Sequence, residues 1–170
     1  MPDTLAPHLR RAFDYEARCT PLTVADLRAA RQKVEQIAVA SLAAPLERAI
    51  EVFCHIQGAR RLWLSRVSDL TTFPPDGVFP VWPVEKAERD ALELDALWAQ
   101  FARSFTDDAL VRPVEYTSTE GAAFASTLAD IAAHVVNHSS YHRGQIAMLV
   151  AHAGTKPAVT DYIALTRAKR

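Results

Sequence analysis

The chain has 170 residues, of which 49% are hydrophobic and 23% are charged, so it is long enough to bury one core and a small pocket. Its formal net charge is -1 and no basic run follows a phosphate backbone, which argues against nucleic acid as a partner. No apolar stretch approaches the ~20 residues of a membrane-spanning helix, and no signal-peptide core precedes residue 9. We therefore expect one soluble, cytoplasmic domain over residues 1–170, with no membrane partner.

Long segments rich in Ala and Leu, with prolines at the joints, predict an all-α chain. A short amphipathic segment over about 7–17 should end or bend at Pro21, because proline lacks the amide hydrogen of a helical residue. Thr23 and Asp26 then resemble a capping box. They predict a first long helix that continues to about Leu42.

Pro45 suits the first turn of a second helix, which carries His55 and continues to about Val67. Residues 71–83 contain too many prolines to be helical, so they predict a long, aromatic-rich crossover. A third helix follows over about 85–104, with an apolar face opposite many charges.

The alternation of residues 114–125 predicts a small β-hairpin before the last long helix, with a loop as the alternative. Thr127 and Asp130 form a second capping-box pattern at the start of that helix. We expect the helix to continue to Ala153, where Gly154 is placed as a C-cap.

A short helical turn after residues 160–161 closes the chain. Four long helices with one extended crossover between the second and the third predict a four-helix bundle. Metal sites in such bundles are commonly built from inward side chains on facing helices.

Half of the chain's six histidines lie within residues 134–145 of the last long helix, where His134, His138 and His142 recur every fourth residue. Residues four apart on a helix lie one turn above another, so the three imidazoles form one stripe. By helical projection this stripe falls in the middle of the buried face, and His55 also turns toward apolar surface. Burying several imidazoles costs free energy unless each finds a hydrogen-bond partner or a metal.

His138 and His142 can direct two imidazoles at one point, as helical zinc motifs do. No glutamate lies between them, so the general base of the zinc-protease motif is missing and proteolysis is disfavoured. A single inward histidine such as His55 is more often a hydrogen-bonded core residue than a ligand. Haem is a weaker interpretation, because two axial histidines would leave the third unexplained. Cys19 and Cys54 show no ligand-type spacing and are expected to be ordinary thiols.

The segment Asn137-His-Ser-Ser-Tyr-His-Arg-Gly-Gln145 resembles the signature of the DinB/YfiT-like superfamily of bacterial proteins. This family is distinct from the DNA polymerase that shares the DinB name. Residues 54–66, which include His55, Trp63 and Arg66, resemble the motif of the family's second helix, and residues 160–163 resemble its closing segment. The resemblance covers most of the chain.

This resemblance implies an up-down-down-up bundle that binds a divalent metal ion, usually nickel or zinc, through His55, His138 and His142. Three imidazoles leave such an ion at least one open position for water or substrate, as in catalytic sites. His134 shares the stripe but lies one turn earlier. It can form a hydrogen bond, line the pocket or face the crossover.

Neighbouring residues receive supporting roles, and none is assigned a catalytic role. Gln145 falls near the histidine face and is expected to fix an imidazole tautomer, whereas Arg143 is expected to form a structural ion pair. Tyr141 can donate to substrate or pack against the crossover. Glu51 and Arg66 flank the second-helix histidine at helical spacing and fit ion pairs at the rim of the site.

The resemblance also implies a metal-dependent enzyme, either a thiol-dependent S-transferase or a hydrolase, acting on a small-molecule substrate. A low-molecular-weight thiol such as bacillithiol or mycothiol is the implied cosubstrate. The alternative is a non-catalytic metal-binding stress-response protein, whose ion stabilises the bundle. We expect a homodimer, because the aromatic residues over 73–82 can form a dimer contact, although they can equally form a lid.

Overall fold

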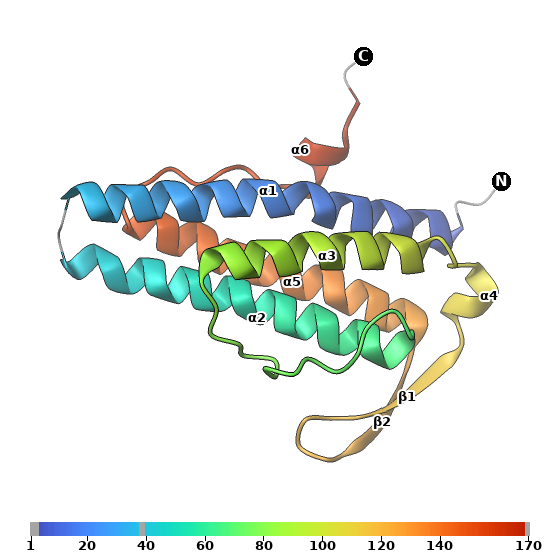
Figure 1. Cartoon of the computed structure of the whole chain (residues 1–170). Helices are drawn as coiled ribbons and strands as arrows, with labels where there is room; N and C mark the ends of the chain where they lie inside the picture. The colour runs from blue at the N-terminus through green and yellow to red at the C-terminus, as the bar shows by residue number, and fades with distance from the viewer. Residues whose placement is uncertain (1–3, 38–39, 169–170) are drawn as a thin grey trace.

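Four long helices form a bundle in the computed structural model, which describes residues 4–37 and 40–168 (Figure 1). α1 and α5 run in one direction and α2 and α3 in the other, so the topology is up-down-down-up. α2 packs mainly against α5, and α1 packs mainly against α3. The predicted all-α four-helix bundle is confirmed. The four helices are α1 (Leu5–Ile37), α2 (Ala43–Val67), α3 (Val84–Ala102) and α5 (Leu128–His152).

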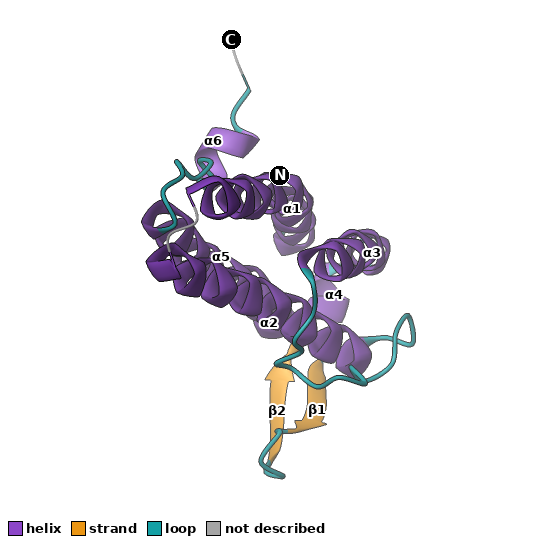
Figure 2. Cartoon of the chain, turned by 60° about the vertical axis from the view of Figure 1, so that its left-hand side comes forward, coloured by secondary structure: helices purple, strands orange, loops and turns teal. Residues whose placement is uncertain are grey.

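Five shorter elements join or flank the bundle. The predicted hairpin is present, and it lies beside the end of α2 (Figure 2). Its antiparallel strands turn through residues 118–122, where Gly121 has a φ of 88° that glycine adopts readily. The single-turn α4 was not among the predicted elements, whereas the predicted C-terminal turn is α6. The elements are η1 (Ala40–Leu42), α4 (Asp107–Leu110), β1 (Pro113–Thr117), β2 (Ala123–Thr127) and α6 (Tyr162–Thr166).

The prediction that the first helix breaks at Pro21 is wrong, because α1 passes through this residue without interruption. Pro21 is exposed, so the carbonyl one turn earlier, which loses its amide partner, can be hydrated instead. The helix ends at Ile37 rather than near Leu42. Residues 38–39, which the prediction includes, lie outside the described residues.

The predicted capping box at Thr23 and Asp26 is also wrong, because both side chains have other partners. The Thr23 hydroxyl donates to the Cys19 carbonyl at 3.0 Å, within the continuous helix. Both carboxylate oxygens of Asp26 accept from the Ala158 amide, at 3.0 and 2.9 Å. Asp26 therefore ties the C-terminal segment to α1 instead of starting a helix.

The other helix ends lie close to their predicted positions. Thr127 caps α5, because its hydroxyl oxygen accepts from the Asp130 amide at 3.1 Å. Gly154 follows the end of this helix with a φ of 89°.

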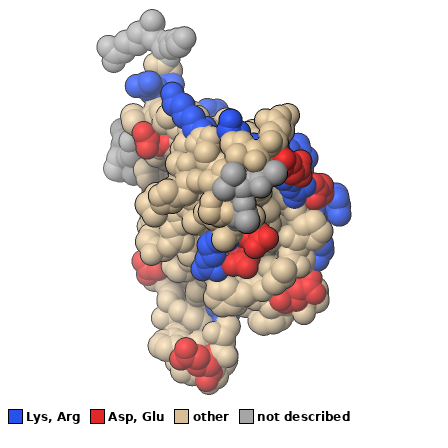
Figure 3. Space-filling model, turned by 90° about the vertical axis from the view of Figure 1, so that its left-hand side faces the viewer, with Lys and Arg blue, Asp and Glu red and all other residues tan. Residues whose placement is uncertain are grey.

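No helix within residues 4–37 and 40–168 is both long and apolar enough to cross a membrane. Basic and acidic side chains are interspersed on the face in Figure 3.

A layer of buried polar side chains crosses the bundle between two apolar clusters. Arg143 Nη1 donates to Glu16 Oε2 at 2.9 Å, which confirms the ion pair expected for Arg143. Arg60 Nη2 donates to Asp95 Oδ1 at 2.7 Å. Each of the four long helices contributes to this polar layer, which we define as Glu16, Gln57, Arg60, Asp95 and Arg143.

Breaking one pair of the polar layer should destabilise the bundle strongly. We expect Arg143→Met to lower the free energy of unfolding by about 3–5 kcal/mol, because Glu16 would keep a buried, unpaired charge. The double variant Arg143→Met/Glu16→Leu should recover most of this loss. Urea unfolding of the metal-free protein measures both changes.

The matched control is Arg28→Met, which breaks an ion pair with Glu88 whose arginine side chain is 56% exposed. We expect a change within about 1 kcal/mol for this variant. A similar loss for Arg28→Met and Arg143→Met would contradict a special role for the buried pair.

Candidate metal centre

Three histidines from two helices converge on one flank of the bundle. One ring nitrogen from each of His55, His138 and His142 lies within 4.8 Å of the others. The Nε2 atoms of His138 and His142 are 3.2 Å apart. Two imidazoles on one zinc ion have nitrogens about 3–3.5 Å apart, since each bond is about 2.0–2.1 Å long. The three side chains can therefore hold a metal ion.

Hydrogen bonds fix which nitrogen two of these rings present. His55 Nδ1 donates to the Val78 carbonyl at 2.7 Å, and because a carbonyl can only accept, Nε2 keeps its lone pair. His142 Nδ1 donates to Gln145 Oε1 at 2.8 Å, which again leaves Nε2 free. The role expected for Gln145 is thus confirmed. Partners of this kind hold a ligating imidazole in one orientation.

Two of the three imidazoles, those of His55 and His138, are held in the neutral form, which is the form that binds metals. Burial lowers the pKa of His138 to about 4, with a further contribution from the neighbouring His142 and His55. Burial also lowers the pKa of His55, against the opposing effect of its hydrogen bond to Val78. At neutral pH these two side chains need lose no proton to bind an ion.

The histidine stripe lies at the edge of the buried face of α5, not in its middle as the helical projection predicts. The middle is occupied by Val135, Ser139 and Arg143. Ser139 donates to the Val135 carbonyl at 2.9 Å, and Arg143 pairs with Glu16, so both polar side chains are satisfied inside the bundle. A projection based on hydropathy assigns such residues to the surface and shifts the predicted face.

His134 lies outside the cluster of three and is exposed. Its ring centroid is 5.3 Å from that of Trp63 and 5.5 Å from that of His138. The structure therefore places His134 as an aromatic neighbour of the site, beside a residue of α2.

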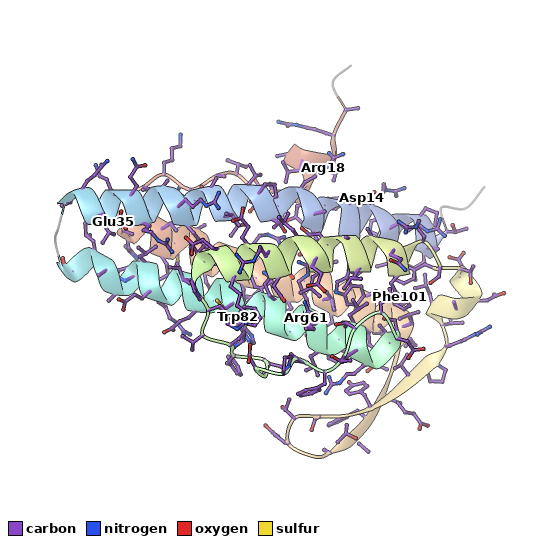
Figure 4. All side chains as sticks on the ribbon, in the orientation of Figure 1. Asp14, Arg18, Glu35, Arg61, Trp82 and Phe101 are labelled. Atoms are coloured by element: carbon purple, nitrogen blue, oxygen red, sulfur yellow. The ribbon has the colours of Figure 1, made fainter. Side chains whose placement is uncertain are left out.

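The crossover, residues 68–83, lies along α2 and supplies a backbone contact to the site. Figure 4 labels Arg61, which projects from α2, and Trp82, which lies at the end of the crossover that leads into α3. Arg61 Nη1 donates to the Thr71 hydroxyl at 2.8 Å, and the Cys54 thiol donates to the Trp82 carbonyl at 3.6 Å. The predicted crossover is confirmed. Because it lies along α2, the carbonyl of Val78 is within hydrogen-bond distance of the His55 ring.

Gly58 allows this close approach and was not among the predicted site residues. A Cβ atom at this position would lie 2.8 Å from the Val78 carbonyl oxygen. The sequence did carry a signal, since a glycine inside a predicted helix indicates close packing against another backbone.

Two pockets flank His55, and the ring of Phe79 lies between them. This ring stacks on His55 with centroids 4.3 Å apart and planes at 5°. The first pocket has a volume of about 460 Å³ and is lined by Arg48, Glu51, Val52, His55, Phe79, Pro80, Val81 and His142. The second has a volume of about 390 Å³ and extends from His55 and Phe79 toward the hairpin. Tyr141 packs on His142 at 5.1 Å and is 67% exposed.

Of the two residues expected to form ion pairs at the rim of the site, Glu51 forms one and Arg66 does not among the described residues. Glu51 accepts from Arg48 at 2.8 Å, as an ion pair on α2. Arg66 instead donates to the Thr117 carbonyl at 2.6 Å and lies over the ring of Trp63, with its Cζ 4.6 Å from the centroid. Helical spacing could not predict this, because the hairpin supplies the acceptor.

Replacing Gly58 should disturb the site through Val78. We expect Gly58→Ala to destabilise the protein by about 1–3 kcal/mol, because the crossover must move. The change should also weaken metal affinity about 10- to 100-fold, since His55 loses its hydrogen-bond partner. Gly144→Ala on α5 is the matched control, because nothing lies within 4 Å of the added Cβ. It should stabilise by about 0.5–1 kcal/mol, and an equal gain for Gly58→Ala would contradict the close approach.

His138 should make the metal-free protein sensitive to acid. Below its ordinary pKa of 6.5 the unfolded chain takes up a proton that the folded protein excludes down to about pH 4, so stability falls as the pH drops through this window. Allowing for partial exposure, we expect the wild type to lose about 2 kcal/mol more than His138→Gln between pH 7 and 4. Urea unfolding measures this, and His152→Gln, at an exposed position, should follow the wild type.

Comparison with known proteins identifies the family. The sequence model of the DinB family matches residues 13–169. Protein DinB of Bacillus subtilis (strain 168) is 30% identical over 79 residues, which cover 46% of this chain and 45% of that protein. No solved structure matches the chain. Because the family model covers nearly the whole sequence, the protein belongs to the DinB family.

Proposed function

We propose that this protein is a metal-dependent enzyme in which His55, His138 and His142 hold one divalent ion, nickel or zinc. The observation that carries the proposal is the convergence of three imidazoles from α2 and α5 beside a pocket of about 460 Å³. Three protein ligands are typical of catalytic sites, since they leave a position for substrate. When bound, the ion would supply Lewis-acid activation of water or of a thiol.

The surrounding residues prepare the site for a small organic substrate. Val78 and Gln145 hold two of the imidazoles, so binding need not reorient them. Val52, Pro80 and Val81 give the first pocket an apolar wall, while Arg48 and Glu51 offset each other's charge at its edge. We propose S-transfer as the reaction: the sulfur of a low-molecular-weight thiol bonds to an electrophilic atom of the substrate, and the leaving group on that atom departs with the thiol proton. Where water takes the place of the thiol, the outcome is hydrolysis.

A non-catalytic metal-binding protein is the second candidate, and the composition of the pockets favours it. Glu51 is the one carboxylate that lines either pocket within the described part of the chain, and it is paired with Arg48. Neither pocket therefore offers a free carboxylate as general base. Any activation of a nucleophile would depend on the ion itself.

Metal content tests the three ligands. We expect about one divalent ion per chain in untagged protein after dialysis, and a large loss in each of His55→Ala, His138→Ala and His142→Ala, because two imidazoles bind less tightly than three. Elemental analysis by mass spectrometry measures this. His134→Ala is the matched control on the same helix and should keep its ion. Wild-type content in all three ligand variants would exclude the site.

The same samples separate the two candidate functions. In cobalt-substituted protein the enzyme requires an exchangeable position, so a thiol should change the visible spectrum of the ion. An ion whose spectrum responds to neither thiols nor small anions would leave only the metal-binding function.

A further inference from the structure

The second pocket beside the histidines contains a cation that has no carboxylate partner. We call it the arginine pocket; it has a volume of about 390 Å³. His55 and Phe79 also line it, so it opens onto the histidine cluster. The residues that define it are Trp63, Arg66, Tyr116, Ser118, Thr119 and Phe124.

Arg66 is held in place by aromatic rings rather than by an acid. Its Cζ lies 4.6 Å from the ring centroid of Trp63 and 4.9 Å from that of Tyr116, and Nη2 donates to the Thr117 carbonyl. None of the ion pairs among the described residues includes Arg66. A guanidinium has five N–H donors, so most of them remain available. Burial lowers the pKa of Arg66, the direction expected for a cation that loses water without gaining an anion.

The hairpin adds a hydroxyl donor on the same side. Ser118 Oγ accepts from the Glu120 and Ala122 amides, at 3.3 and 3.1 Å. Its own proton is therefore free to be donated toward the pocket. The first pocket differs, because its arginine, Arg48, is already paired with Glu51 at 2.8 Å. Of the two pockets that share His55, the arginine pocket is thus the one suited to an anion.

We propose that the arginine pocket binds a carboxylate group of the small molecule whose reactive end lies at the histidines. A planar guanidinium matches a carboxylate through two parallel hydrogen bonds. Arg66 is the single cation among the residues that line this pocket, which suits a carboxylate monoanion better than a phosphate dianion. The inference deepens the proposed function and rests on it for the chemistry at the reactive end.

The positions on α2 set the length of the ligand. Arg66 lies 11 residues after His55, which is about 16 Å along a helix axis. Both side chains lean toward the N-terminus, but the longer arginine reaches back further than the histidine, so the gap between the guanidinium and the imidazole is roughly 10–15 Å. The expected ligand is therefore as long as a short peptide, with aromatic surface from Trp63 and Phe124 beside its middle.

Two probes of matched shape test the carboxylate contact. S-methylglutathione is a tripeptide with two carboxylates and no free thiol, and its diethyl ester lacks both negative charges. Titration calorimetry gives their dissociation constants with metal-loaded and with metal-free protein. We expect the wild type to bind the acid about tenfold more tightly than the ester, because only the acid forms charge-assisted hydrogen bonds.

Variants assign this difference to one side chain. Arg66→Gln should weaken binding of the acid about tenfold and leave the ester within about twofold, whereas Arg66→Lys, which keeps the charge, should fall between. Arg28→Gln, outside both pockets, is the control and should change neither, whereas Arg48→Gln in the first pocket tests whether the preference follows that arginine instead. Unfolding midpoints of the variants check that the hairpin stays in place.

Equal binding of acid and ester by the wild type would overturn the inference without any variant. It would also be overturned if the preference followed Arg48, or if neither probe bound at about 10 mM. A failure of the proposed function gives a different result from a failure of this inference. If the His55, His138 and His142 variants kept their metal while S-methylglutathione still depended on Arg66, the carboxylate pocket would stand and the metal enzyme would not.

Discussion

The polar layer decides how the helices of this bundle are rotated about their axes. Apolar side chains pack acceptably in several rotations, but a buried charge needs one particular partner. Arg143 must face Glu16 on α1, and Arg60 must face Asp95 on α3. Arg143 directly follows His142, so turning Arg143 toward α1 directs the adjacent imidazole toward α2. The orientation of the candidate metal centre thus depends on an ion pair of the next residue, about 100° around the same helix.

Much of the fold follows from the sequence, because prolines, caps and apolar periodicity mark four helices, the crossover and the hairpin. The pairing of His138 and His142 also follows from helical spacing alone. His55 joined them only through a family resemblance, since spacing within one helix gives no distance to another. The exposure of Pro21 and the ion pair between Arg143 and Glu16 depend on tertiary packing. For that reason local patterns mispredicted the helix break and the centre of the buried face.

The topology of the chain supplies the hydrogen bond between His55 and the Val78 carbonyl, which no side chain in the sequence predicts. Because α2 and α3 run in parallel, the chain must return along the C-terminal part of α2 before α3 begins (Figure 1). This return path brings the Val78 carbonyl to the ring of His55, and Gly58 leaves room for it. A backbone carbonyl has no signature in a sequence, so the orienting partner of His55 could be inferred only from the glycine that permits it.

Phe79 stacks on His55 and lines both pockets, so it lies where the histidine cluster meets the surfaces that would contact a ligand. The imidazoles belong to two rigid helices, whereas Phe79 and the residues of the arginine pocket beyond it come largely from the crossover and the hairpin. Substitutions in the crossover and the hairpin can alter the size and polarity of the two pockets without moving an imidazole. Ligand preference can therefore vary through residues 68–83 and 113–127, together with Trp63 and Arg66 of α2, while the three histidines stay the same.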